Sequence, residues 1–147
     1  MPTRQGTRSI KKNQMLLEQQ LREAHAQGVR WYTEFRIDGK LPLVRGRRFK
    51  RNPQPVTITH TNGKTVTYPA LGKRGWYIFT EAVKSANGNI TIECSGPYTK
   101  AGTARGAGSH SITINEIGTV ERSTPRATSD IPTKAERAAA LGLGTEA

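Results

Sequence analysis

The spacing of apolar residues changes once along this chain of 147 residues, from a helical period to a period of two. Between residues 10 and 24 the apolar positions recur three or four residues apart, with Leu17 and Leu21 at the centre, which predicts an amphipathic helix. From residue 29 onward apolar and polar residues alternate, which predicts half-buried strands. We therefore expect a mainly β domain that carries one surface helix near its start.

The expected helix covers residues 9–28 and follows a basic arm, residues 1–8, that has no periodicity. Either Ser9 or Asn13 supplies the N-cap, and Gly28 stands where helices usually end. Only one narrow stripe of this helix is apolar, so we expect it to lie against the chain's own sheet or against a neighbouring molecule.

Two hairpin signals, Asp38-Gly39 and Asn62-Gly63, mark turns between alternating segments. The expected strands are residues 29–37, 41–44, 56–60, 66–68, 76–79, 90–94 and 111–115, the last extended toward residue 120. Six or seven short strands at regular spacing are typical of a small antiparallel sandwich or barrel. The predicted fold is thus mainly β (α+β), with an N-terminal amphipathic helix, a β-domain at residues 29–122 and a short C-terminal helix.

A glycine-rich segment, residues 96–109, separates the last two expected strands. It contains four glycines, the cations Lys100 and Arg105, and no acidic residue. It is longer than an ordinary hairpin loop, and it lacks the Gly-Lys-Ser/Thr ending of a phosphate-binding P-loop. We expect a mobile loop that orders on a partner; the alternative is a plain flexible loop.

Residues 123–147 are expected to form a linker and a short helix. Thr133 and Glu136 match a capping box at the start of this helix, and its apolar surface consists mainly of Leu141 and Leu143. A helix this short is marginal in water by itself. It must therefore dock against other structure or fray.

The charge of the chain is concentrated near its start. There are 23 Lys and Arg against 11 Asp and Glu, a net charge of +12. Residues 1–51 hold 13 of these cations and 4 of the acids, a net charge of +9, or three quarters of the excess. Such asymmetry indicates a polyanionic partner; the alternative is a basic face that meets only solvent.

A dense basic cluster at residues 45–51 is the strongest candidate for phosphate contact. Five cations lie within those seven residues; guanidinium groups match phosphate oxygens, and Phe49 would stack on a base. A localisation signal and a solvated loop are the alternatives. The full set of candidate nucleic-acid-binding residues is Arg4, Arg8, Lys11, Lys12, Arg45, Arg47, Arg48, Phe49, Lys50, Arg51, Lys73, Arg74, Lys100 and Arg105.

Nothing in the sequence predicts an enzyme. Cys94 is the single cysteine, and His25, His60 and His110 are far apart in the chain. A nucleophile–base pair of Cys94 with His60 or His110 is conceivable, but no local motif supports it. We expect no catalytic residues, no cofactor and no metal.

Two functions are compatible with these features. The first is a non-enzymatic nucleic-acid-binding protein that contacts the DNA or RNA backbone with weak sequence preference. The signatures of helix-turn-helix, zinc-finger and RNP1 proteins are absent, so this hypothesis rests on charge and sheet architecture alone. The alternative is a structural subunit of a large assembly, such as the capsid, connector or tail of a virus or phage particle.

The two hypotheses differ in what orders the ends of the chain. In an assembly, self-association or contact with neighbouring subunits through the terminal arms would bury Leu17, Leu21, Leu141 and Leu143 between chains. No apolar run approaches the length of a membrane span, and no apolar segment follows the first cations as in a secretory signal. We expect no membrane partner and a cytoplasmic location, or a place in the virion under the alternative.

Overall fold

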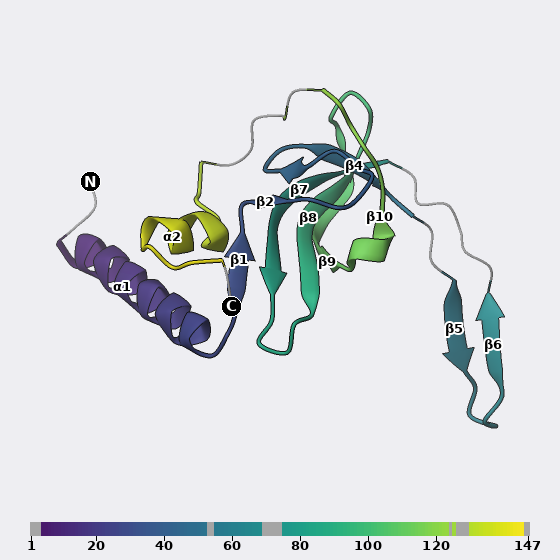
Figure 1. Ribbon diagram of the computed structural model, residues 1–147, viewed down its shortest axis with the longest axis horizontal. Coiled ribbons are helices and arrows are strands. Elements are labelled where there is room, and N and C mark those ends of the chain that lie inside the picture. Colours follow the sequence, from purple (N-terminus) through teal and green to yellow (C-terminus); the bar gives the residue numbers. More distant parts are fainter. Residues whose placement is uncertain (1–3, 53–54, 69–74, 124, 126–129, 146–147) are drawn as a thin grey trace.

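The structure is a computed structural model that describes residues 4–52, 55–68, 75–123, 125 and 130–145. In the described residues most of the ordered chain is strand, with one helix near each end, which confirms the predicted fold class (Figure 1). The elements in chain order are α1 (Arg4–Ala26), β1 (Arg30–Tyr32), β2 (Glu34–Phe35), β3 (Leu43–Val44), β4 (Arg48–Arg51), β5 (Val56–Thr59), β6 (Thr65–Tyr68), β7 (Trp76–Lys84), β8 (Ile90–Tyr98), β9 (Ala104–Ile112), the 3-10 helix η1 (Ile114–Glu116), β10 (Ile117–Val120) and α2 (Lys134–Ala140).

Strand β7 is the centre of the antiparallel sheet, which has six strands in the described part of the chain. Along the sheet the order is β10-β4-β7-β8-β9, and β1 also pairs with β7. Strand β4 lies beside the start of β7, where Phe49 is opposite Tyr77, whereas β1 lies beside its end, where Trp31 is opposite Val83. The two short strands thus share one edge of β7.

One face of this sheet carries the main core. The register of β7 against β8 shifts between Phe79 and Glu81, so Phe79 and Ala82 both lie on this face with Ile92, and all three are fully buried. Leu43 and Phe49 join them from the first part of the chain. Strand β10 closes the core with Ile117 and Val120.

The opposite face carries a second, smaller core. Leu21 of α1 and Trp31 of β1 are buried there against Ala135 and Ala138 of α2. Leu17, Leu141 and Leu143 pack against this cluster from outside. The C-terminal helix therefore docks within its own chain, and the leucines that the assembly hypothesis placed between chains are used inside one chain.

The start of the chain differs from its prediction. Helix α1 begins at Arg4, so residues 4–8 belong to the helix rather than to an arm, and neither Ser9 nor Asn13 is its N-cap. Residues 1–3 lie outside the described residues. The expected strand 29–37 is broken into β1 and β2, because the chain bends at Thr33 and leaves the large sheet.

The hairpin predicted at Asp38-Gly39 is present, since β2 pairs with β3 as a separate two-stranded sheet. The one predicted at Asn62-Gly63 is also present, and it joins β5 to β6.

The glycine-rich segment is not a long loop. Residues 96–98 continue β8, residues 104–109 begin β9, and a turn closed by the Thr99 N–H to the Thr103 carbonyl (2.8 Å) joins them. Gly96 and Gly108 face each other across the two strands. Alternation could not reveal this pairing, because glycine has no side chain to mark a face. The strand expected at 111–115 consequently ends at Ile112, and β10 is a separate element.

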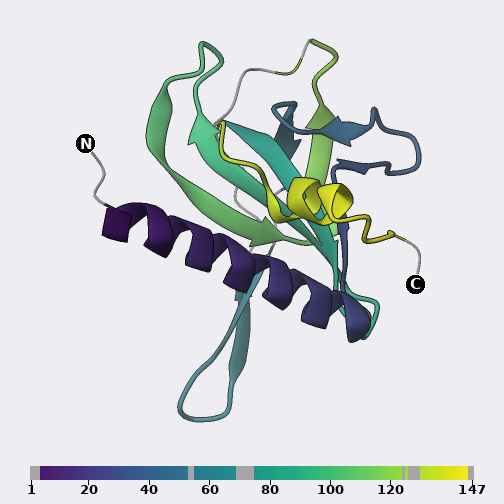
Figure 2. The same cartoon turned by 90° about the vertical axis from the view of Figure 1, so that its left-hand side faces the viewer.

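Two elements extend away from the sheet. The β5–β6 hairpin points outward at the end of the molecule opposite α1 (Figure 1). Figure 2 shows α1 crossing in front of the sheet, with its N-terminal half reaching past α2. Neither helix, over the described ranges, is long and apolar enough to span a bilayer.

Candidate functional site

The basic cluster at residues 45–51 is dispersed by the strand that it forms. Alternation along β4 turns Arg48 and Lys50 to one side and Phe49 to the other. Most side chains of the cluster contact other residues of the same chain.

Phe49 does not stack on a base, contrary to the sequence prediction. Its side chain is fully buried in the main core, with its ring centroid 6.2 Å from that of Tyr77. A core position requires an apolar side chain in β4, and a base would have to displace the core to reach this one.

Arg48 is likewise not available for contact with a phosphate. It is 5% exposed, and its guanidinium donates two hydrogen bonds to the Glu121 carboxylate and one to the Lys100 carbonyl (2.7 Å). The hydrogen bond to Glu121 raises the pKa of Arg48, which burial alone would lower. The guanidinium also lies over the Trp76 ring, 5.0 Å from its centroid. Arg48 thus holds the fold together.

Three further arginines of the cluster have intramolecular partners. Arg51 pairs with Glu116 at 2.8 Å and lies over Tyr77. Arg45 pairs with Glu136 at the start of α2. Arg47 donates to the Pro42 carbonyl at 2.8 Å. The contacts of Arg45 and Arg51 join segments distant in sequence, whereas that of Arg47 is local.

The remaining candidates are scattered. Lys50 is exposed, with its ammonium 4.9 Å from the centroid of the Trp76 ring, and Lys100 is exposed in the turn between β8 and β9. Lys73 and Arg74 lie outside the described residues, as does the side chain of Arg105. The candidates whose side chains the structure describes are therefore not gathered on one surface.

The start of α1 retains a concentration of cations. Positions 4, 8, 11 and 12 are three or four residues apart within one helix, and Lys11 and Lys12 are exposed. The first turn holds no acidic residue. Cations at a helix N-terminus oppose the macrodipole, so they weaken the helix unless an anion lies nearby.

The conceivable nucleophile–base pair is not assembled. The Cys94 thiol lies 3.8 Å from the His110 backbone carbonyl, while the imidazole of His110 contacts the Gly96 carbonyl at 3.0 Å. Burial raises the pKa of Cys94 to about 12, so the thiol stays protonated at neutral pH. Across the described ranges, no three His, Cys, Asp or Glu side chains converge as metal ligands.

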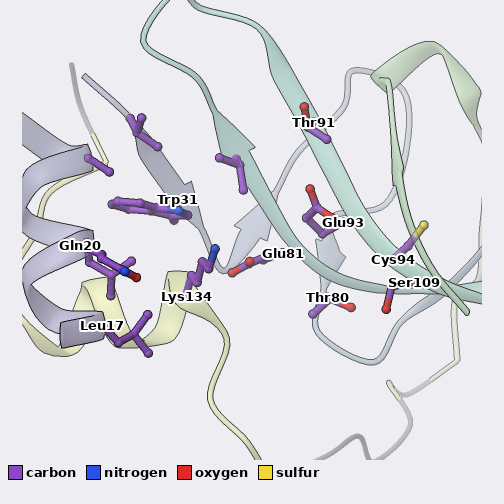
Figure 3. A pocket seen from close by; sticks show the side chains of 14 residues that line it. Leu17, Gln20, Trp31, Thr80, Glu81, Thr91, Glu93, Cys94, Ser109 and Lys134 are labelled. Atoms are coloured by element: carbon purple, nitrogen blue, oxygen red, sulfur yellow. The ribbon is translucent and has the colours of Figure 1, made fainter. Parts of the chain in front are cut away.

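A groove of about 650 Å³ lies between α1 and the sheet (Figure 3). One wall is apolar and consists of α1 and β1 side chains such as Leu17, Ala24 and Trp31. The other wall is the open part of the sheet, with Thr91 and Glu93 of β8 and further polar groups from β7 and β9.

Two carboxylates oppose each other on the floor of this groove. Glu81 of β7 is directly opposite Glu93 of β8. Glu81 is buried and accepts a hydrogen bond from the Ala135 N–H at 2.7 Å. Burial raises the pKa of Glu81, the hydrogen bond from Ala135 opposes that rise, and the charge of Glu93 adds to it. Like charges directly opposite in a sheet are destabilising, and the charge of Lys134, which also lines the groove, lowers the pKa of Glu81.

The β5–β6 hairpin has two chemically different faces. Ile58 is opposite Val66 on one face, which Tyr68 extends, and all three are exposed, at 44%, 39% and 48%. The other face carries threonines, with the hydroxyls of Thr57 and Thr67 3.0 Å apart. This is an apolar surface with no covering element among the described residues.

Sequence reasoning missed both the groove and the exposed hairpin face. The alternation at residues 56–68 predicted two half-buried strands. Both strands are present, but their apolar side chains are exposed, because alternation carries no information on what covers a strand. The facing carboxylates of Glu81 and Glu93 depend on the register between β7 and β8, for which the sequence holds no direct signal.

Comparisons of the chain with protein-family models, with curated proteins and with solved structures find no match in any of the three.

Proposed function

We propose that this chain is a structural subunit of a larger protein assembly, in which its projecting elements contact neighbouring subunits. The observation that carries the proposal is the β5–β6 hairpin. Within the described residues its strands pair only with each other, and its apolar side chains face solvent.

The energetics of the hairpin support this proposal. An isolated two-stranded hairpin is at best marginally stable in water. Burying Ile58, Val66 and Tyr68 against a partner would gain about 1 to 2 kcal/mol for each side chain. A partner surface thus supplies the stabilisation that the hairpin lacks within one chain.

The N-terminal half of α1 supports the same function. Met15 and Leu16 are 71% and 47% exposed on a helix segment that reaches beyond the body of the molecule. Two projections with exposed apolar side chains, at opposite ends of the molecule (Figure 1), suit a subunit that has a neighbour on each side.

The test is sedimentation of the purified chain over a range of concentrations of about a hundredfold. We expect reversible association into larger species, and we expect the double variant Ile58→Ser with Val66→Ser to remain monomeric. Ile131→Ser is the matched control, since Ile131 is 70% exposed but lies outside the hairpin. A native chain that stays monomeric throughout would refute a subunit that self-associates.

The exposed cations of α1 favour nucleic-acid binding as a second candidate function. Lys11 and Lys12 lie in a helix whose first half holds four cations and no acidic residue. Each phosphate contact adds about 0.9 to the slope of log affinity against log salt for duplex DNA. The exposed cations of α1, and not the cluster at residues 45–51, would carry this activity.

Binding to random-sequence DNA and RNA, measured across a series of salt concentrations, tests this candidate. Replacing Arg4, Arg8, Lys11 and Lys12 by Ala should reduce the slope by about three to four. Lys40→Ala, which removes an exposed cation elsewhere, should change it by no more than about one. Equal affinities of the quadruple variant and the native chain would exclude α1 as the contact.

A further inference from the structure

We infer that the groove between α1 and the sheet receives the β5–β6 hairpin of a second copy of this chain. This inference rests on the proposed function and specifies which two surfaces meet. Each contact then joins the hairpin of one copy to the groove of another.

The two walls of the groove differ in the same way as the two faces of the hairpin. The α1 side of the groove is apolar: Leu17 is half-buried there and packs against the cluster that contains the buried Trp31 (Figure 3). The sheet side is polar, with Thr80, Thr91 and Ser109. An amphipathic two-stranded element fits this arrangement.

The hairpin supplies the complementary faces. Ile58, Val66 and Tyr68 would lie against the α1 wall. On the other face, Thr57 is opposite Thr67 and Thr59 is opposite Thr65. This threonine face would meet the hydroxyl-bearing sheet wall, where threonine and serine side chains can exchange hydrogen bonds.

Charge favours the same occupant. The hairpin, residues 55–68, carries His60 and Lys64 and no acidic residue. The floor of the groove carries Glu81 and Glu93 in direct opposition, with Lys134 at the α2 side. A cation brought in by the hairpin would relieve the repulsion between the two carboxylates.

The hairpin cannot occupy the groove of its own chain. It projects from the end of the molecule opposite α1, and both views show it pointing away from the sheet (Figures 1 and 2). When two copies exchange hairpins they form a two-fold dimer, and when each copy passes its hairpin to a further copy they form a closed ring or an open filament. In every case each contact joins one hairpin to one groove.

Complementation between two defective variants tests the inference. The hairpin variant is Ile58→Ser with Val66→Ser, and the groove variant is Gln20→Lys with Glu93→Lys. Gln20 and Glu93 both line the groove, and neither is buried. Gln19→Lys is the control, because Gln19 is exposed on the same helix but outside the groove.

We expect each variant alone to be monomeric, with native circular dichroism and self-association weakened at least about tenfold. An equimolar mixture should form dimers and nothing larger, because it contains one intact hairpin and one intact groove in each pair. Adding Lys64→Glu to the groove variant should restore association.

Three outcomes would overturn the inference. A groove variant that associates like the native chain would show that the groove is not the contact, and so would a mixture that stays monomeric; the proposed function would survive both. A native chain that does not associate would refute both the inference and a self-associating subunit.

Discussion

Arg48 and Glu121, 73 residues apart in sequence, form a bidentate ion pair on the side of β4 opposite Phe49. The backbone reinforces the pair, since the Glu121 N–H donates to the Arg48 carbonyl at 2.9 Å. This contact fixes the end of β10 to the large sheet. An arginine that composition assigns to a nucleic acid is thereby part of the framework of the fold.

Replacing Arg48 by Ala should lower the free energy of unfolding by about 3 kcal/mol, because it leaves the Glu121 carboxylate without its guanidinium in a mostly buried site. Lys50→Ala, two residues along the same strand, removes an exposed ammonium and should cost no more than about 0.5 kcal/mol. Urea unfolding of the two variants measures the difference. Equal losses would contradict a structural role for Arg48.

Gly96→Ala should destabilise the protein strongly, whereas Gly108→Ala, at the position directly opposite, should not. A Cβ at Gly96 would lie 2.6 Å from Cδ1 of Tyr77 and 2.9 Å from the Trp76 carbonyl oxygen. A Cβ at Gly108 would meet no atom within 4 Å. We expect losses of more than about 2 kcal/mol and less than about 1 kcal/mol, respectively, in thermal unfolding. Similar melting temperatures for the two variants would contradict a close contact of Gly96 in β8 with Trp76 and Tyr77 in β7.

The protonation of Glu81 should make stability fall as pH rises. Burial raises the pKa of Glu81, so the native chain binds its proton more tightly than the unfolded chain does. The free energy of unfolding therefore decreases as pH rises from the unfolded pKa through the native one. Glu81→Gln does not titrate and should lack this decrease, so it should gain stability relative to the native chain toward neutral pH. Urea unfolding of both proteins at a series of pH values measures this difference in the free energy of unfolding.

Glu116 provides the opposite case as a control. Burial raises the pKa of Glu116, but hydrogen bonds from Arg51 and Thr113 lower it, and the lowering prevails. Its contribution to stability is present above the unfolded pKa and is lost as pH falls through the native one. Glu116→Gln should therefore lose stability relative to the native chain toward neutral pH. If both variants gained stability relative to the native chain toward neutral pH, or both lost it, the raised pKa of Glu81 would be refuted.

The Cys94 thiol should not react with thiol reagents while the chain is folded. It is 3% exposed, and burial raises its pKa to about 12, so the reactive thiolate is scarce and shielded. A chromogenic disulfide should label it at the rate at which the native structure opens, and promptly in denaturant. Rapid labelling of the native chain would show that the strand face around Cys94 is accessible.

Local sequence signals predicted the elements that depend on short-range physics. Helical spacing through Leu17 and Leu21 identified α1, and the pair of Thr133 with Glu136 identified α2 through its capping box, which the structure contains. Asn62-Gly63 located the turn of the β5–β6 hairpin. These signals succeed because a few neighbouring residues supply the whole interaction.

The candidate site was less predictable, because the same cations serve two purposes. Arg48 and Arg51 are indistinguishable in sequence from phosphate-binding arginines, and only their distant partners Glu121 and Glu116 show otherwise. The glycines at 96 and 108 indicated a loop by composition, yet they are paired across β8 and β9, and Gly96 lets β8 approach the Tyr77 side chain closely.

The sequence by itself determined the periodicities, the turns, the capping box of α2 and the excess of positive charge. The first three depend on residues close together in the chain. Only the tertiary structure decided which charges are neutralised inside the molecule, that Glu81 faces Glu93, and that Ile58 and Val66 remain uncovered. These features depend on strand register and on contacts between segments distant in sequence, where one residue of slippage exchanges a buried face for an exposed one.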